Sequence, residues 1–90
     1  MQRYDVYILR CCDGSYYTGI TNDIDRRLGE HNAGVDRKAY TFNRRPVKLV
    51  YCSEFWDVHQ AIEWEKRVKR WSRAKKEALI QQEYERLPSH

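Results

Sequence analysis

A tight β-hairpin near the start of the chain constrains the fold more than any other feature. The run Val6–Leu9 is apolar throughout, which indicates a strand covered on both faces and therefore central in its sheet. Asp13-Gly14 is a strong turn signal, and Ser15–Ile20 returns as a second strand. We therefore expect the first two strands to be antiparallel neighbours.

The length of the hairpin loop decides whether two tyrosines of the hairpin, Tyr7 and Tyr17, can meet. Side chains alternate between the two faces of a strand, so a loop of two residues would place these tyrosines on opposite faces. A loop of three residues, with Gly14 in the left-handed conformation and a bulge, shifts the register by one and places both on one face. A joint site that uses both tyrosines therefore requires a loop with an odd number of residues.

A short helix is expected next, from about Asp23 to Ala33. Asp23 belongs to a cluster of N-capping residues, and Gly34 provides the C-cap. Arg27 and His31 are four positions apart, so they lie on one side of this helix, beside the apolar stripe that faces the core. Taken alone, Arg27 would be interpreted as the partner of Asp23 in a surface ion pair.

The second half of the chain predicts one more strand and two more helices. Residues 35–45 look like a long basic loop, and the alternating apolar residues over 47–52 indicate a third strand that lies beside the first. A helix from 57 to about 70 and a last helix over about 73–85 follow, with Leu87–His90 as a tail. The residues expected to bring these helices into contact with the core are Val58, Ala61, Ile62, Val68, Ala74, Ala78 and Leu79.

Glu65 stands within the apolar face of the helix expected over 57–70. It follows Ala61 by four positions and precedes Val68 by three. A carboxylate that faces the core is costly unless a cation accompanies it. The spacing leaves two interpretations open: a structural ion pair with Arg27 or another base, and a metal ligand.

Composition indicates a cytoplasmic single domain that binds a polyanion. The 90 residues carry a net charge of +4 and contain no apolar run long enough to span a membrane. The three cysteines lack the spacing of a disulfide framework or a zinc site. Bases without intervening acids occupy residues 37–48 and 66–76, and such clusters favour nucleic acid as the partner. The bases expected to contact it are Arg37, Lys38, Arg44, Arg45, Lys69, Arg70 and Arg73.

The hairpin carries two motif elements that resemble those of the GIY-YIG endonuclease superfamily. The first element matches residues 5–7, where Asp5 replaces the usual glycine. The second matches residues 17–19, where Thr18 replaces the usual isoleucine. Some members have a lysine directly after the second element, where this chain has Ile20.

The later elements of the superfamily occur in the same order. Arg27 is followed after four positions by His31, and Glu65 ends an apolar stretch that begins with Ala61. The resemblance extends over nearly the whole chain and is greatest to the small, stand-alone bacterial members. It implies a single GIY-YIG-like nuclease domain over residues 1–90, of the α+β class, with a three-stranded antiparallel sheet flanked by three helices in the order ββαβαα.

The resemblance further implies a metal-dependent endonuclease that hydrolyses phosphodiester bonds of nucleic acid. Glu65 would hold one Mg²⁺ or Mn²⁺ ion, and Arg27 would bind the scissile phosphate. Tyr17 would be the general base for the attacking water, with Tyr7 positioning that water or the phosphate. His31 would accept the proton from Tyr17 or help to bind the phosphate. These five residues are the expected catalytic set.

The expected substrate is DNA rather than RNA, cut with low sequence specificity by a monomer that lacks a separate binding domain, or with specificity supplied by a partner protein. A non-catalytic nucleic-acid-binding module of the same fold is the alternative. A third interpretation is a protein-interaction domain in which the tryptophans, Trp56, Trp64 and Trp71, mark the partner surface. The complete catalytic set favours the enzyme, because binding alone needs neither a core-facing carboxylate nor paired tyrosines.

Overall fold

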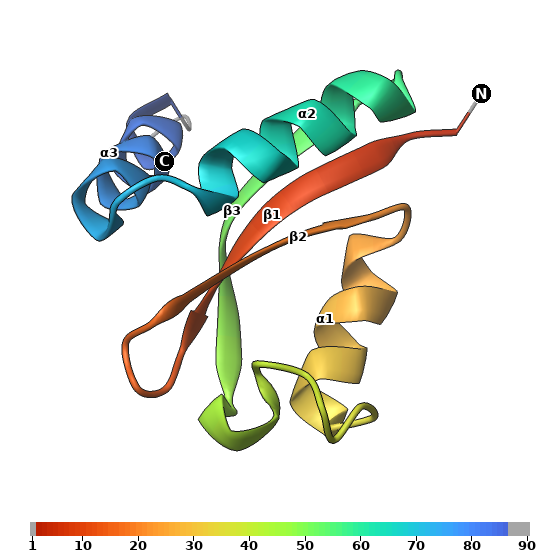
Figure 1. Cartoon of the computed structure of the whole chain (residues 1–90), viewed down its shortest axis with the longest axis vertical. Coiled ribbons are helices and arrows are strands. Elements are labelled where there is room, and N and C mark those ends of the chain that lie inside the picture. The colour runs from red at the N-terminus through yellow and green to blue at the C-terminus, as the bar shows by residue number, and fades with distance from the viewer. Residues whose placement is uncertain (1, 87–90) are drawn as a thin grey trace.

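The three strands form an antiparallel sheet in the order β2-β1-β3 (Figure 1). A computed structural model describes residues 2–86, so the tail expected over Leu87–His90 lies outside the described residues. The predicted order of strands and helices is confirmed, and the expected loop over 35–45 contains one short 3₁₀ turn, η1. The elements are β1 (Tyr4–Cys11), β2 (Tyr16–Thr21), α1 (Ile24–Ala33), η1 (Phe42–Arg44), β3 (Val47–Phe55), α2 (Val58–Lys69) and α3 (Arg73–Arg86).

The hairpin loop consists of residues 12–14, so the condition on the two tyrosines is met. Tyr7 pairs with Gly19, two positions beyond Tyr17, and both tyrosines therefore point to the same face of the sheet. Gly14 has a φ of 85°, in the left-handed region, as predicted. The expectation of an odd loop length is confirmed.

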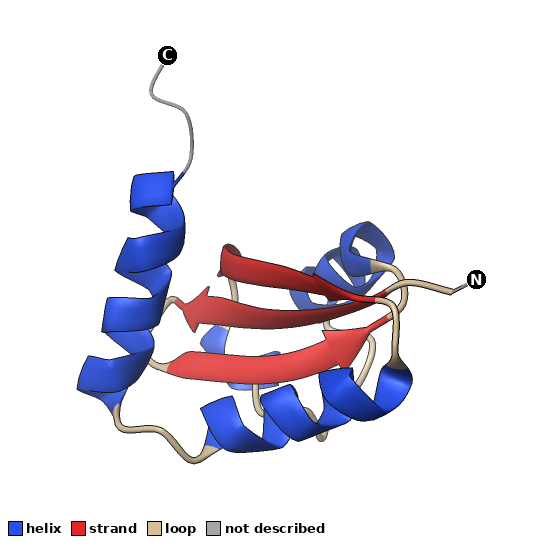
Figure 2. Cartoon of the chain, turned by 90° about the horizontal axis from the view of Figure 1, so that it is seen from above, coloured by secondary structure: helices blue, strands red, loops and turns tan. Residues whose placement is uncertain are grey.

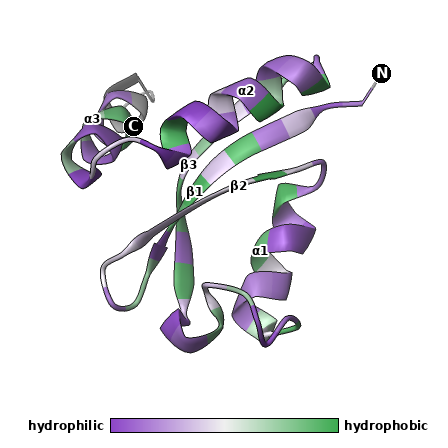
Figure 3. Cartoon of the chain, in the orientation of Figure 1, coloured by the Kyte–Doolittle hydropathy of each residue, from purple (hydrophilic) through white to green (hydrophobic). Residues whose placement is uncertain are grey.

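β1 is the central strand, and every residue from 5 to 9 on it is at most 1 % exposed. On the face of the sheet that α1 covers, Tyr7 and Leu9 form a core cluster with Val47, and Leu28 of α1 packs against it. Hydrophobic residues accordingly lie along β1, while the outward sides of the helices are hydrophilic (Figure 3). Burial on both faces explains the unbroken apolar run that predicted a central strand.

The opposite face of the sheet is covered by α2 and α3, so that the strands lie between helices (Figure 2). Ile8 and Tyr51 meet Val68 of α2 there. The partly buried residues that pack against this second cluster are Tyr16, Val50, Trp64, Trp71, Leu79 and Ile80.

No helix among the described residues is long and apolar enough to cross a membrane.

Three of the expected core contacts of the helices are wrong. Ile62 is 37 % exposed, because α2 turns the neighbouring stripe of Ala61 and Val68 toward the sheet. Ala74 and Ala78 are exposed, and α3 packs through larger side chains instead. Alanine removes little apolar area from water on burial, so its spacing on a helix is a weak sign of the core face.

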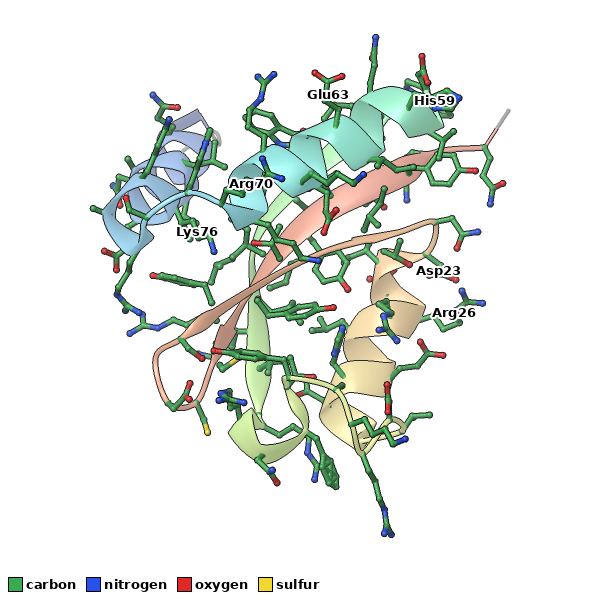
Figure 4. All side chains as sticks on the ribbon, viewed as in Figure 1. Asp23, Arg26, His59, Glu63, Arg70 and Lys76 are labelled. Atoms are coloured by element: carbon green, nitrogen blue, oxygen red, sulfur yellow. The ribbon has the colours of Figure 1, made fainter. Side chains whose placement is uncertain are left out.

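The ends of α1 are set by the capping residues that predicted them. Asp23 accepts a hydrogen bond from the Arg26 N–H at 3.1 Å, and Gly34 follows the helix with a φ of 69°. Arg26 projects away from the sheet (Figure 4). The side of α1 that carries Arg27 and His31 lies toward the hairpin, as the contacts below show.

Candidate active site

A buried chain of hydrogen bonds joins β1, α1 and the loop before β3. The Tyr7 hydroxyl lies 3.1 Å from His31 Nε2, and His31 Nδ1 lies 2.8 Å from Thr41 Oγ1. His31 is 4 % exposed and Thr41 only 1 %. Both ring nitrogens of His31 are therefore engaged, which holds the ring in one orientation.

Arg27 lies beside the Tyr7 hydroxyl, on the solvent side of this chain. Its side chain is 35 % exposed, interacts electrostatically with Tyr7 and Tyr17, and pairs with Glu30 at 3.3 Å rather than with Asp23, the partner considered from the sequence. A guanidinium can only donate hydrogen bonds, which favours the tautomer in which the Tyr7 hydroxyl donates to His31 Nε2. In that tautomer His31 carries its proton on Nδ1, and this N–H donates to Thr41 Oγ1.

Burial keeps Tyr7 and His31 neutral near pH 7. It raises the pKa of Tyr7 to about 12, although the neighbouring Arg27 opposes the shift. Burial and then the positive charge of Arg27 lower the pKa of His31 from its usual 6.5. A neutral imidazole that faces a phenol is arranged to accept the phenolic proton.

Tyr17 forms the outer part of the same aromatic group. Its ring centroid lies 6.3 Å from that of Tyr7 and 5.2 Å from that of His31. A Cβ at Gly19 would lie 2.5 Å from the Tyr7 hydroxyl. Only glycine at position 19 therefore leaves room for the Tyr7 side chain to pass over β2. Of the two tyrosines, Tyr7 is the one whose hydroxyl lies at hydrogen-bond distance from His31, whereas the resemblance implied a proton transfer from Tyr17 to His31.

Glu65 faces the sheet from α2, and a lysine one turn later balances its charge. The Glu65 side chain is 10 % exposed, and Oε2 lies 2.7 Å from Lys69 Nζ. The sequence left Arg27 or another base as the ion-pair partner of Glu65, and in the structure that partner is Lys69. Lys69 also interacts electrostatically with Tyr17, which connects α2 to the aromatic group. β2 is an edge strand that lies between α1 and α2, so the helices that carry Arg27, His31 and Glu65 flank this edge (Figure 1).

A divalent ion fits Glu65 as a single carboxylate ligand. Among the described residues, no three His, Cys, Asp or Glu side chains converge to hold a metal. A hard ion that keeps most of its water and uses phosphate oxygens needs only one or two protein carboxylates.

Two departures from the motif, Asp5 and Thr18, are buried. Asp5 is 1 % exposed and forms an ion pair with Arg3 at 3.4 Å, while its Oδ2 has no hydrogen-bond partner among the described residues and burial raises its pKa. Thr18 is 3 % exposed, and its Oγ1 has no hydrogen-bond partner among the described residues.

The basic loop before β3 is fastened to the hairpin by its own arginines. Arg44 pairs with Asp13 at 3.1 Å and lies 3.9 Å from the centroid of the Tyr40 ring. Tyr40 in turn stacks on Tyr17, with centroids 6.1 Å apart and an interplanar angle of 22°. Arg45 donates to a backbone carbonyl of η1 at 2.7 Å. Two of the bases expected to bind nucleic acid therefore hold the loop in place.

The remaining expected bases differ in how free they are. Arg73 donates to the Gly14 carbonyl at 2.7 Å and so attaches α3 to the hairpin. The side chains of Arg37, Lys38 and Arg70 make no hydrogen bond or ion pair within residues 2–82. Arg70 lies at the C-terminal end of α2 (Figure 4). These three side chains are free to bind an anion.

The chain is similar to known proteins over most of its length. Residues 3–78 match the model of the GIY-YIG catalytic domain. A UPF0213 protein of Halobacterium salinarum is 49 % identical over 77 residues, which cover 86 % of this chain and 99 % of that one. A UPF0213 protein of Syntrophus aciditrophicus is 44 % identical and covers 97 % of this chain and 100 % of its own. The NMR structure of a protein from E. faecalis has a TM-score of 0.66 at 32 % identity, covering 100 % of this chain and 95 % of that chain. The chain therefore belongs to the GIY-YIG family and is similar to its small UPF0213 members.

Proposed function

We propose that this protein is a divalent-metal-dependent endonuclease that hydrolyses phosphodiester bonds, with DNA as its preferred substrate. The GIY-YIG domain family is a nuclease family. The supporting observation is that the buried Tyr7–His31 hydrogen bond, with Arg27 beside it, and a core-facing carboxylate, Glu65, lie on elements that flank the edge strand β2, with Lys69 interacting with both Glu65 and Tyr17. A module that only binds nucleic acid needs neither of these buried features.

Tyr7 and His31 act as the proton acceptor for the attacking water. The Tyr7 oxygen takes the proton from the water while its own proton passes to His31 Nε2. The 3.1 Å contact between the Tyr7 hydroxyl and His31 Nε2 favours Tyr7 as the general base, with Tyr17 positioning the water or the phosphate. This exchanges the roles of the two tyrosines implied by the sequence resemblance.

Arg27 binds the scissile phosphate. Its present partner Glu30 is 38 % exposed, and a surface ion pair of this kind is weak enough for a phosphate to displace the carboxylate. Glu65 would hold Mg²⁺ or Mn²⁺, and the ion would supply positive charge to offset the negative charge that develops on the phosphate. Arg27 would thus act on the phosphate from α1, and Glu65 would act on it from α2.

Arg37, Lys38 and Arg70 contact phosphates that flank the site. Contacts of this kind depend on charge and not on base sequence, which accounts for low sequence specificity. Each contact releases condensed counterions from the nucleic acid, so binding should weaken steeply as salt is added.

The test compares the wild type with Glu65→Gln on single-stranded, duplex and branched DNA and on structured RNA, each with Mg²⁺ or Mn²⁺. We expect cleavage by the wild type and a loss of about a hundredfold or more in Glu65→Gln, with binding retained, because the metal's charge stabilisation is lost. Glu63→Gln is the matched control, since Glu63 points outward from the same helix and should cut normally (Figure 4).

Two results would overturn the proposal. Binding without cleavage by either the wild type or Glu65→Gln would identify a non-catalytic module. Absence of binding even at low salt, where phosphate contacts are strongest, would exclude both nucleic-acid functions.

A further inference from the structure

We propose that Lys69 occupies the cation position on Glu65 in the metal-free protein and must be displaced before a divalent ion binds. This inference rests on the proposed function, because it concerns the same carboxylate. At 2.7 Å, the Lys69–Glu65 contact is the shortest ion pair in the described part of the chain.

The two partners differ in how firmly the fold holds them. Glu65 is fixed against the sheet with a side chain 10 % exposed, whereas the Lys69 side chain is 54 % exposed. The pair Arg67–Glu63 on the same helix has side chains 58 % and 73 % exposed, as is usual for a surface pair. The Glu65 pair therefore combines a fixed, buried anion with a cation that can move into solvent, as the longer Arg3–Asp5 pair also does at 3.4 Å.

A buried carboxylate requires a cation whether or not a metal is present. Removing one partner of such a pair leaves a poorly solvated charge, which is strongly destabilising. Lys69 supplies the cation when no metal is bound, and the divalent ion takes over that role when it enters. The ion pair therefore preserves the position of Glu65 in the metal-free protein.

The two cations cannot share the carboxylate without strong repulsion. A Mg²⁺ or Mn²⁺ ion coordinates oxygen at about 2.0–2.2 Å, so it would lie close to the Lys69 ammonium. Lys69 already interacts with Tyr17, so the displaced ammonium stays beside the site. A bound phosphodiester gives that ammonium a new anionic partner. The metal and the nucleic acid should therefore bind cooperatively.

The experiment measures Mn²⁺ affinity by electron paramagnetic resonance, without nucleic acid, in the wild type, Lys69→Gln, Lys66→Gln and Glu65→Gln. Lys69→Gln should bind Mn²⁺ about tenfold more tightly or better, because a unit charge at contact with a divalent ion is worth more than one decade even in water. Lys66→Gln loses the same charge at a position that does not face Glu65, so its affinity should change less than about twofold.

A second measurement uses the wild type alone and is independent of how the variants fold. The side-chain NMR signals of Lys69 should shift as Mg²⁺ is added and should saturate with it, while those of Lys66 stay in place. Lys69 signals that do not respond to a saturating metal concentration would refute the displacement.

The outcomes separate this inference from the proposed function. If Mn²⁺ binding depends on Glu65 but is equally tight in Lys69→Gln and Lys66→Gln, Lys69 does not compete with the metal. That result refutes this inference and is still consistent with a metal-dependent nuclease. Absence of Glu65-dependent binding in every protein, Lys69→Gln included, overturns the metal role of Glu65 and this inference with it.

Discussion

Thr41→Val tests whether Thr41 orients the ring of His31. Valine has nearly the shape of threonine, so the substitution removes the hydroxyl from a site that is 1 % exposed and leaves no sizeable cavity. His31 Nδ1 loses the acceptor that lies 2.8 Å away. The ring can then keep a buried N–H without a partner, or move its proton to Nε2.

The expected loss of stability follows from that unpaired group. A buried polar group without a hydrogen bond costs about 1–3 kcal/mol, and the added methyl group recovers part of it. We expect a net loss of about 1–2 kcal/mol, which lowers Tm by about 4–16 °C in a domain of this size. A proton on Nε2 would also prevent His31 from accepting the Tyr7 proton. Cleavage should then fall about 10–100-fold, as for other residues that orient a functional histidine.

Side-chain ¹⁵N NMR of His31 is the decisive assay. The wild type should show the Nδ1–H tautomer, and Thr41→Val should shift the population toward Nε2–H. Thr41→Ser is the control, because it loses a methyl group but keeps the hydroxyl and should retain the wild-type tautomer. An unchanged tautomer in Thr41→Val, or equal behaviour of the valine and serine variants, would show that Thr41 does not orient the ring.

Two further predictions concern Tyr7 and its neighbour on β2. Gly19→Ala should destabilise the fold by about 1–3 kcal/mol, because the new Cβ would lie 2.5 Å from the Tyr7 hydroxyl. Gly29→Ala, where nothing lies within 4 Å of the added Cβ, should instead stabilise α1 in the same thermal unfolding assay. Tyr7 should account for a loss of about 2 kcal/mol of stability between pH 10 and 12, because with its pKa of about 12 it stays protonated when folded and ionises on unfolding. Denaturant titrations should show much less of this loss in Tyr7→Phe, and an equal loss in both proteins would contradict the burial of Tyr7.

The features predicted well from the sequence depend on local rules. The position of Gly14 and the alternation of side chains on a strand determine that Tyr7 and Tyr17 share a face, and the structure confirms it. The side of a helix that packs, in contrast, depends on the surface it meets. The prediction that Ile62 contacts the core was wrong for that reason, because Ala61, at the preceding position, packs against the sheet instead.

Thr41 and Tyr40 were missed because no local rule reaches them. They lie in a loop without hydrophobic period, and its path is determined by contacts with distant parts of the chain. Thr41 meets a histidine ten positions earlier, and Tyr40 meets Tyr17 across the hairpin. Their only sequence signal is an aromatic and a hydroxyl residue adjacent to each other within a basic segment, which is common in loops of every kind.

The basic residues show the same difference between local and distant contacts. Arg44 reaches an acid 31 positions away, and Arg73 reaches a carbonyl 59 positions away, so neither contact is visible in spacing. An ion pair removes one charge of each sign, so the net charge of +4 is unaffected by these contacts. The long-range electrostatic attraction for a polyanion therefore depends on the net charge of the sequence and is not changed by the ion pairs that form on folding. The phosphate contacts depend instead on which side chains folding leaves unpaired, which makes Arg37, Lys38 and Arg70 the residues whose removal should most reduce the salt dependence of binding.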